Sequence, residues 1–303
     1  MPLDPLVLFF LLGLFATLLQ VPLRLPESIS QFLAFYLLLA LGMKGGSSLS
    51  AAQGGEFLIV ASLGVTSCLV IACASFAWAR RTLSLADSAA IAASYGSVSA
   101  ITFIVAQGQI GVPHGSYMVA VMAVMEIPAI ALALYFYQRS LPTRGSWVRA
   151  AFGHKSVALL LGGFFLGAIL SAEQAKTIQP VMVDAFRGVL ALYLIDLGSA
   201  AAKDLFASLN SRALVTAILL PLTYGTLALA CAWLAGVSHG NAVLLGVLAG
   251  SASYIAAPAA IRMSVPEASP GYYATYPLAF TFTFNLTLGI PFYAALGNLL
   301  FTP

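Results

Sequence analysis

Long apolar runs, separated by short polar or glycine- and proline-containing breaks, extend along most of the chain. Segments such as 57–79 and 213–235 are apolar all round a helix, and each is long enough to cross about 30 Å of hydrocarbon at about 1.5 Å per residue. A core helix of a soluble protein would keep one polar face instead. The pattern therefore predicts an all-α integral membrane protein.

Charges, prolines and glycines divide these runs into ten predicted membrane helices. Their expected ranges are 3–21, 28–43, 57–79, 86–107, 115–138, 155–171, 180–200, 213–235, 242–261 and 272–299. The charged segment 139–155 separates the first five from the last five. We therefore expect a first five-helix repeat over 1–138, a cytoplasmic linker over 139–154 and a second, inverted five-helix repeat over 155–303.

Lysine and arginine are unevenly distributed between the two sets of loops. Of the 13 such residues, only Lys44, Lys176 and Arg187 fall on one side, and the others lie in 22–27, 80–85, 139–155, 201–212 and 262–271. In membrane proteins the cytoplasmic loops carry the excess of positive charge. We therefore expect a multi-pass protein of the cell (inner) membrane, with both termini outside and the linker in the cytoplasm.

Composition supports this class and disfavours others. The chain is 61% hydrophobic and 8% charged, against about 25% charged residues in a typical soluble domain. Its net charge of +3 is too small to indicate a nucleic-acid partner. The three cysteines lie in apolar segments without metal-ligand spacing, and the chain has neither a nucleotide-binding loop nor an H-E-x-x-H zinc motif. We do not expect an enzyme.

A short polar motif occurs once in each half of the chain. GSVS (96–99) aligns with GSAS (250–253) at an offset of 154 residues, and with small gaps Gly13 lies near Gly163 and 35–42 near 191–198. Because five is an odd number of spans, the second half must enter the membrane from the opposite side, as in the inverted repeats of secondary transporters. Chance similarity among Ala, Leu and Gly is the alternative interpretation.

Both motifs lie about halfway along a predicted span, where a helix interruption is costly. Backbone N–H and C=O groups left without partners in hydrocarbon cost several kcal/mol each, so a break is tolerated only around a cavity or within protein. Pro258 lacks an N–H and favours two half-helices over one straight helix in the second motif. Half-helix N-termini with serine hydroxyls suit a small anion. Close packing through small residues is the alternative.

Five motifs, which include GSVS, follow one another along nearly the whole chain. They are LPESISQFLAFYLLLALGMKGG (25–46), GSVS (96–99), MEIPAIALAL (125–134), FRGVLALYL (186–194) and SASYIAAPAAIRMSVPEASPGYYATY (251–276). In this order they resemble the cyanobacterial-type sodium-dependent bicarbonate transporters. The resemblance implies ten helices in a 5+5 inverted repeat, broken helices four and nine, a core domain that moves against a gate domain, and homotrimers that take up bicarbonate with sodium.

The departures from that family fall at the two motifs. In GSVSAIT (96–102), Ala100 and Ile101 replace a glycine and a serine. In SASYIAAP (251–258), Tyr254 replaces an acid, and the further replacements of serine or glycine by alanine are Ala252, Ala256 and Ala257. The short linker argues against regulation by a PII-like protein.

These observations lead to a set of candidate site residues. For the substrate we expect Gly96, Ser97, Ser99, Thr102, Gly250, Ser251, Ser253 and Tyr254. For cation coupling we expect Glu126, a carboxylate deep in a span, with sodium nearby, and Asn285 as its counterpart in the second half. An acid held neutral by a neighbour is the alternative for Glu126. Asp196, late in its span, is expected near the membrane interface.

Three functions are compatible with the sequence. The first is a secondary active carrier that takes up bicarbonate, or a similar small anion, with sodium by alternating access around the two half-helix breaks. The second keeps this fold but carries a different small anion in a proton-coupled or uncoupled cycle. The third is a degenerate carrier that acts as a sensor or scaffold, which the loss of the acid at Tyr254 favours.

Overall fold

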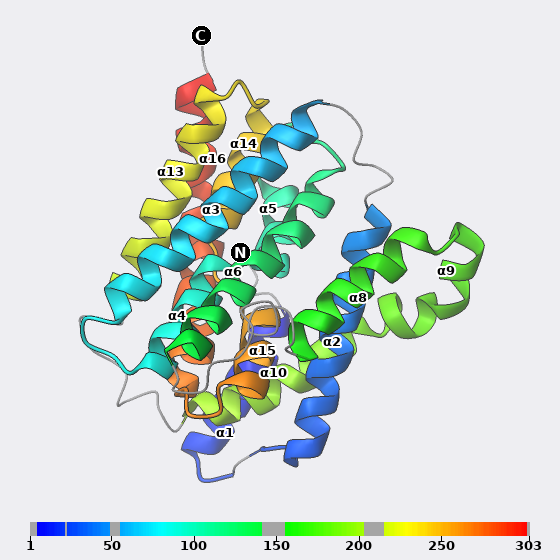
Figure 1. Ribbon diagram of the computed structural model, residues 1–303, viewed down its shortest axis with the longest axis vertical. Coiled ribbons are helices and arrows are strands. Elements are labelled where there is room, and N and C mark those ends of the chain that lie inside the picture. Colours follow the sequence, from blue (N-terminus) through cyan, green and yellow to red (C-terminus); the bar gives the residue numbers. More distant parts are fainter. Residues whose placement is uncertain (1–4, 22, 49–54, 141–154, 203–214, 302–303) are drawn as a thin grey trace.

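The computed structural model describes residues 5–21, 23–48, 55–140, 155–202 and 215–301, which form helices and no strand (Figure 1). Most of the predicted linker 139–154, and most of the loop 201–212, lie outside these ranges. Within them, six segments are long and apolar enough to cross a membrane: Glu27–Ser47, Gly55–Ala79, Leu85–Gln109, Met118–Arg139, Val215–Leu234 and Gly271–Phe301. The prediction of an all-α multi-pass membrane protein is confirmed, and the count of ten spans stays a prediction.

The helices of the described residues follow one another along the chain in the order below. The α-helices are α1 (Pro5–Leu18), α2 (Glu27–Ser47), α3 (Gly55–Ala79), α4 (Leu85–Gly96), α5 (Ala100–Gln109), α6 (Met118–Arg139), α8 (Lys155–Ile169), α9 (Ala172–Gln179), α10 (Phe186–Ala202), α13 (Leu220–Leu234), α14 (His239–Ala249), α15 (Ala256–Ser264) and α16 (Ile290–Phe301). The π-helical segments are η2 (Pro180–Asp184), η3 (Val215–Leu219), η4 (Gly271–Phe282) and η5 (Asn285–Gly289).

One group of helices, which we call the panel, consists of α1, α2, α8, α9, η2 and α10. Its two most extensive contacts are α1 with α10 and α2 with α8. Four glycines allow this close approach: Gly13 and Gly198 between α1 and α10, and Gly42 and Gly163 between α2 and α8. A side chain at any of these positions would overlap backbone atoms of the facing helix.

The remaining helices form a second group, which we call the bundle. In Figure 1 the panel helices α2, α8 and α9 lie on the right, and the bundle helices α3, α13 and α16 lie on the left. In an apolar stretch of 18 residues within Leu85–Gln109, which contains α4 and α5, 89% of the residues are buried, against 28% in such a stretch of α3. The bundle therefore has α4 and α5 at its centre and α3 at its surface.

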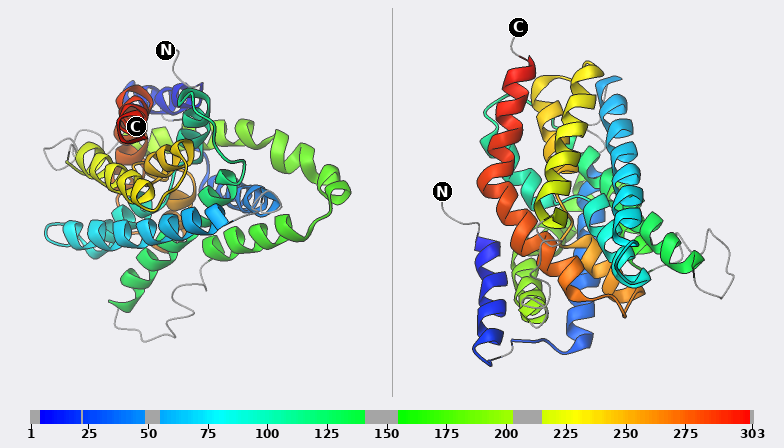
Figure 2. Two further views of the ribbon diagram at one scale, coloured as in Figure 1. Left: turned by 90° about the horizontal axis from the view of Figure 1, so that it is seen from above. Right: turned by 90° about the vertical axis from the view of Figure 1, so that its left-hand side faces the viewer.

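The structure contains a helix that the apolar pattern does not indicate. The run predicted over 155–171 ends earlier, at Ile169, and α9 follows it with a polar sequence. Ser171 caps α9 by accepting a hydrogen bond from the backbone N–H of Gln174, whose side chain in turn accepts from the N–H of Ser171. This capping box explains why the chain turns there, and α9 projects from the edge of the molecule (Figure 2).

Candidate functional site

The helix that begins at Leu85 is interrupted at residues 97–99. α4 ends at Gly96 and α5 begins at Ala100, with Ser97 and Ser99 in extended backbone conformations. Ser99 caps α5, because its Oγ accepts from the backbone N–H of Thr102 at 3.2 Å and from the Thr102 hydroxyl at 2.8 Å. The 12 residues of α4 span about 18 Å, which places this interruption deep within the fold.

The second interruption covers residues 250–255, between α14 and α15. Ser253 Oγ accepts from the backbone N–H of Ala257 at 3.1 Å and so satisfies a donor in the first turn of α15. Pro258 is the third residue of α15, where its missing N–H leaves no hydrogen bond unmade. Ser99 and Ser253, which occupy equivalent positions in the two motifs, thus serve the same purpose for the half-helix that follows.

The two interruptions touch each other. The backbone N–H of Ser99 donates to Ser251 Oγ at 2.9 Å, and the backbone N–H of Ser253 donates to the carbonyl oxygen of Ser94 at 2.8 Å. Ser251 also donates to the carbonyl of Leu248 at 2.7 Å. The side chains of the four motif serines are at most 3% exposed. The structure therefore places the two polar motifs in one buried crossing, which consists of residues 94–102 and 248–257.

A second helix of each half supports its own interruption. Ser97 Oγ donates to the backbone carbonyl of Glu126 in α6 at 3.1 Å, and Asn285 Nδ2 donates to the backbone carbonyl of Gly250 at 2.8 Å. Glu126 is 2% exposed and Asn285 is fully buried. The Asn285 side-chain oxygen has no hydrogen-bond partner among the described residues. Glu126 and Asn285 thus lie beside the crossing on opposite halves of the chain.

Tyr254 fills part of the crossing with an aromatic ring. It is 1% exposed, and its ring lies 4.9 Å from that of Phe282, between centroids. Where the resembling family has an acid, this chain therefore places an apolar surface.

The chemistry of the crossing suits small ions with few charges. Two half-helices begin there, and helix N-termini carry partial positive charge and backbone N–H donors, which stabilise an anion. The backbone carbonyls of the crossing, including that of Glu126, and the Asn285 side-chain oxygen are oxygen ligands of the kind that hard cations prefer. The described residues contain no cluster of three or more His, Cys, Asp or Glu, so a transition-metal site is not indicated there.

One group of charged residues has a larger role in the structure than the sequence indicates. Asp196 is fully buried rather than at an interface, and it accepts hydrogen bonds from the Leu25 N–H at 2.9 Å, the Ser30 hydroxyl at 2.6 Å and Arg262 at 3.1 Å. Arg262 also pairs with Glu27 at 2.6 Å. Glu27 and Ser30 lie in the motif 25–46, and Arg262 lies in the motif 251–276. The sequence therefore marked both segments, but it did not indicate that these side chains contact one another.

Residues 236–240 read GVSHG and match the G-x-S-x-G pattern of serine hydrolases. That motif requires a strand before the serine, and none of the described residues forms one. Ser238 instead precedes α14; its hydroxyl accepts from Asn241 Nδ2 at 2.9 Å and its N–H donates to Glu56 at 2.6 Å. The match is therefore a helix start and not a nucleophile.

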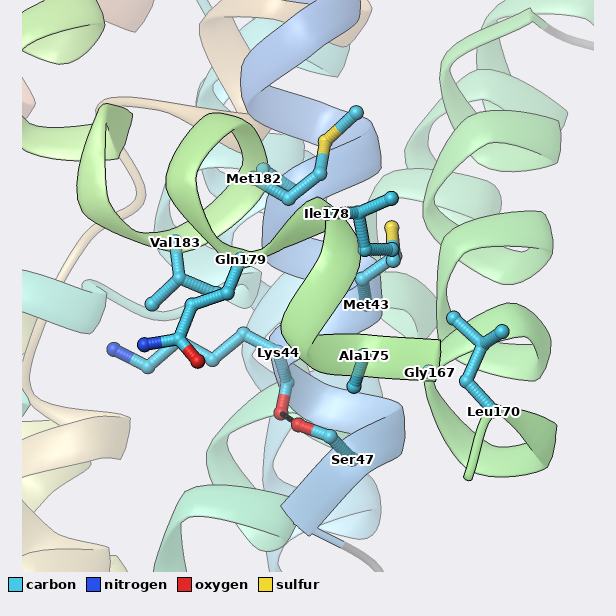
Figure 3. A pocket seen from close by; sticks show the side chains of 11 residues that line it. Met43, Lys44, Ser47, Gly167, Leu170, Ala175, Ile178, Gln179, Met182 and Val183 are labelled. Carbon is cyan, nitrogen blue, oxygen red and sulfur yellow. Dashed lines mark hydrogen bonds between the residues drawn. The ribbon is translucent and has the colours of Figure 1, made fainter. Parts of the chain in front are cut away.

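A cavity of about 160 Å³ lies away from the crossing, within the panel. It is mostly apolar and is lined by residues of α2, α8, α9 and η2, among them Met43, Ile178 and Met182. Figure 3 shows these three side chains around it, with Lys44 and Gln179 extending side by side at its rim. None of the candidate substrate residues lines this cavity.

The sequence as a whole decides the family. Residues 5–298 match the family model described as the Na⁺-dependent bicarbonate transporter superfamily. The chain belongs to this superfamily. No curated protein matches the chain. The matched range includes both interruptions, α6 and the residues around Arg262. The match confirms the resemblance inferred from the motifs.

Proposed function

We propose that the chain is a secondary active transporter that takes up bicarbonate, or a similar small anion, together with sodium. The observation that carries this proposal is the pair of hydrogen bonds from Ser99 to Ser251 and from Ser253 to Ser94, at 2.9 and 2.8 Å. Two interruptions in buried helices, joined to each other, provide polar backbone groups where hydrocarbon would otherwise exclude them. Secondary transporters bind their substrates at such broken helices.

Equivalent contacts in the two halves support a 5+5 inverted repeat with helices four (α4–α5) and nine (α14–α15) broken. Gly13 corresponds to Gly163 and Gly42 to Gly198 in the repeat alignment. The structure pairs α1 with α10 at Gly13 and Gly198, and α2 with α8 at Gly42 and Gly163. Each contact thus joins the first helix of one half to the second helix of the other. A pseudo-two-fold axis predicts this exchange.

In this proposal the panel is the gate domain and the bundle is the core domain. Alternating access then consists of a movement of the bundle against the panel, which exposes the crossing first to one side and then to the other. The uneven loop charges orient both termini outside, in the cell (inner) membrane. From the resemblance we expect a homotrimer, and the short linker argues against regulation by a PII-like protein.

For the anion, we assign the residues around the two half-helix N-termini. They are Gly96, Ser97, Ser99 and Thr102 on one side and Gly250, Ser251, Ser253 and Tyr254 on the other. The N–H groups and hydroxyls of these segments stabilise negative charge in a water-poor site, where electrostatic interactions are stronger than in water. In the structure several of these groups bond to one another.

For sodium, we assign Glu126 and Asn285. The buried side-chain oxygen of Asn285, which has no hydrogen-bond partner within the described part of the chain, supports this assignment, because such an oxygen is costly unless a cation or a donor reaches it. Glu126 lies on the helix that accepts a hydrogen bond from Ser97 of the anion site. Cation and anion would therefore occupy neighbouring positions, and each would favour binding of the other.

The deciding experiment is uptake of labelled bicarbonate into proteoliposomes with an inward sodium gradient. Sodium-stimulated uptake, absent when potassium or choline replaces sodium, is the expected result. Bicarbonate uptake that is unchanged by this replacement would refute sodium coupling. No uptake of bicarbonate or of any other small anion under any gradient would refute the transport function.

The contact between the rings of Tyr254 and Phe282 favours a second candidate function. This candidate is a carrier of another small anion, in a proton-coupled or uncoupled cycle. A site with one acid fewer and more apolar surface disfavours a strongly hydrated ion. Thermal shifts of the purified protein across a panel of monovalent anions, with and without sodium, distinguish the two. A protein that responds to no anion or cation would instead support a sensor or scaffold.

A further inference from the structure

Arg262 contacts three side chains at once. Its Nε and Nη2 atoms donate to the two carboxylate oxygens of Glu27 at 3.2 and 2.6 Å, and its Nη1 donates to Ser30 Oγ at 2.7 Å and to Asp196 Oδ2 at 3.1 Å. The fork to Glu27 is the bidentate geometry that only arginine provides. The Arg262 side chain is 13% exposed and that of Asp196 is fully buried, so one of the two ion pairs is shielded from water.

These contacts cross between the two helix groups. Arg262 lies on α15 in the bundle, whereas Glu27 and Ser30 lie on α2 and Asp196 on α10, both in the panel. The loops beside them, 22–27 and 262–271, belong to the set rich in positive charge, which is predicted to be cytoplasmic. The ion pairs thus join the panel to the bundle at the predicted cytoplasmic end.

The same arginine is connected to the crossing by one short, rigid element. α15 runs for nine residues from Ala256 to Ser264, about 13 Å, with its first turn capped by Ser253 and Arg262 in its last turn. A change at the Ser253 end of such a half-helix moves its other end as well. The anion site and the ion pairs are therefore mechanically linked.

A second cavity, of about 270 Å³, lies directly beside Arg262. Its walls come from both groups: Arg24, Glu27 and Leu197 from the panel side, and Pro266, Ala268 and Tyr273 from the bundle side. A separation of the two groups at this end would widen this cavity toward the crossing. In that case a path from the crossing to the cytoplasm would open at this cavity.

We infer that Arg262, Glu27 and Asp196 form a latch that holds the panel and the bundle closed at this end, and that its release opens the anion path through the neighbouring cavity. The inference rests on the proposed transport cycle and adds the positioning residue that controls one of its steps. Asp196 stays bonded to Leu25 and Ser30 when Arg262 leaves, and Arg24 still lies 3.7 Å from its Oδ1 atom. Release therefore leaves no carboxylate without partners in a dry site.

The test measures access to the second cavity directly. Ala268, which is 5% exposed, is replaced by cysteine in a background where the three native cysteines are alanine. The rate of reaction with a water-soluble maleimide is measured on purified protein in nanodiscs. The latch variant is Arg262→Gln combined with Asp196→Asn, because the double change removes both charges of the shielded ion pair together.

We expect the double variant to react at least about fivefold faster at position 268 than the parent. Arg262→Lys, which keeps the charge but loses the fork, should give an intermediate rate. Arg80→Gln, at an exposed arginine whose guanidinium bonds only the Leu83 carbonyl among the described residues, is the matched control and should not change the rate. Equal rates in the double variant and the parent would overturn the latch.

Uptake by the same variants separates this inference from the proposed function. In the double variant we expect a change of the half-saturating anion concentration by threefold or more, since the open and closed populations shift. If the double variant is labelled faster but neither it nor the parent transports any anion, the latch is supported and the transport function is refuted. Normal sodium-stimulated uptake with unchanged labelling would retain the carrier and refute the latch.

Discussion

The backbone N–H of Ser99 donates a hydrogen bond to Ser251 Oγ across 2.9 Å, although 152 residues separate them in the sequence. Both residues lie in helix interruptions, and both are buried. This bond satisfies a donor that an interrupted helix would otherwise leave without a partner in a dry environment. It also means that the two halves of the chain complete each other at the crossing.

Removal of the Ser251 hydroxyl should weaken the crossing. Ser251→Ala leaves the Ser99 N–H without its acceptor, and an unsatisfied buried donor costs about 1–3 kcal/mol. We expect a lower thermal midpoint in detergent and reduced anion uptake. Ser62→Ala, at an exposed serine that bonds only its own helix among the described residues, is the control and should change neither. An unchanged midpoint for Ser251→Ala would contradict the importance of this bond.

Glu126→Gln should abolish sodium stimulation of uptake. The substitution keeps the size of the side chain and replaces its buried carboxyl group by an amide, while the backbone carbonyl that accepts from Ser97 is unchanged. We expect sodium-stimulated uptake to fall at least about tenfold, which corresponds to about 1.4 kcal/mol. Glu173→Gln makes the same substitution at an exposed position on α9 and should leave uptake unchanged. Full sodium stimulation in Glu126→Gln would exclude Glu126 from coupling.

Asn285→Leu should raise the sodium concentration needed for half-maximal uptake. The change removes the buried oxygen that lacks a hydrogen-bond partner among the described residues and the donor to the Gly250 carbonyl. A rise of about tenfold is expected for the loss of one cation ligand. Thr287→Val alters an exposed residue of the same π-helical segment and serves as control. An unchanged sodium dependence would assign Asn285 a purely structural role.

Two glycine substitutions should have opposite effects on stability. Gly42→Ala forces a methyl group into the backbone of Leu160, and such overpacking costs about 1–3 kcal/mol. Gly162→Ala adds a methyl group where no atom lies within 4 Å, and alanine favours a helix over glycine by about 1 kcal/mol. Thermal unfolding of both variants in detergent gives the comparison. A stable Gly42→Ala would contradict the close contact of α2 with α8.

The sequence by itself determined the class and family of this protein. Hydropathy is a local property, so apolar runs such as 57–79 predict membrane helices without reference to any distant residue. The order of the motifs was sufficient to indicate the superfamily. Local helix-breaking residues also pointed to 96–99 and 250–253 as special segments, because glycine, serine and proline change the backbone where they stand.

Only the tertiary structure decided which of these residues meet. Ser99 and Ser251 lie 152 residues apart, and Arg262 and Glu27 lie 235 residues apart. The sequence predicts Asp196 at the membrane interface. In the structure α10 packs against α1 and α2, Asp196 is buried, and Leu25, Ser30 and Arg262 supply its partners. Hydrogen bonds act through space over about 3 Å. They therefore depend on how helices pack, and no local pattern encodes that packing.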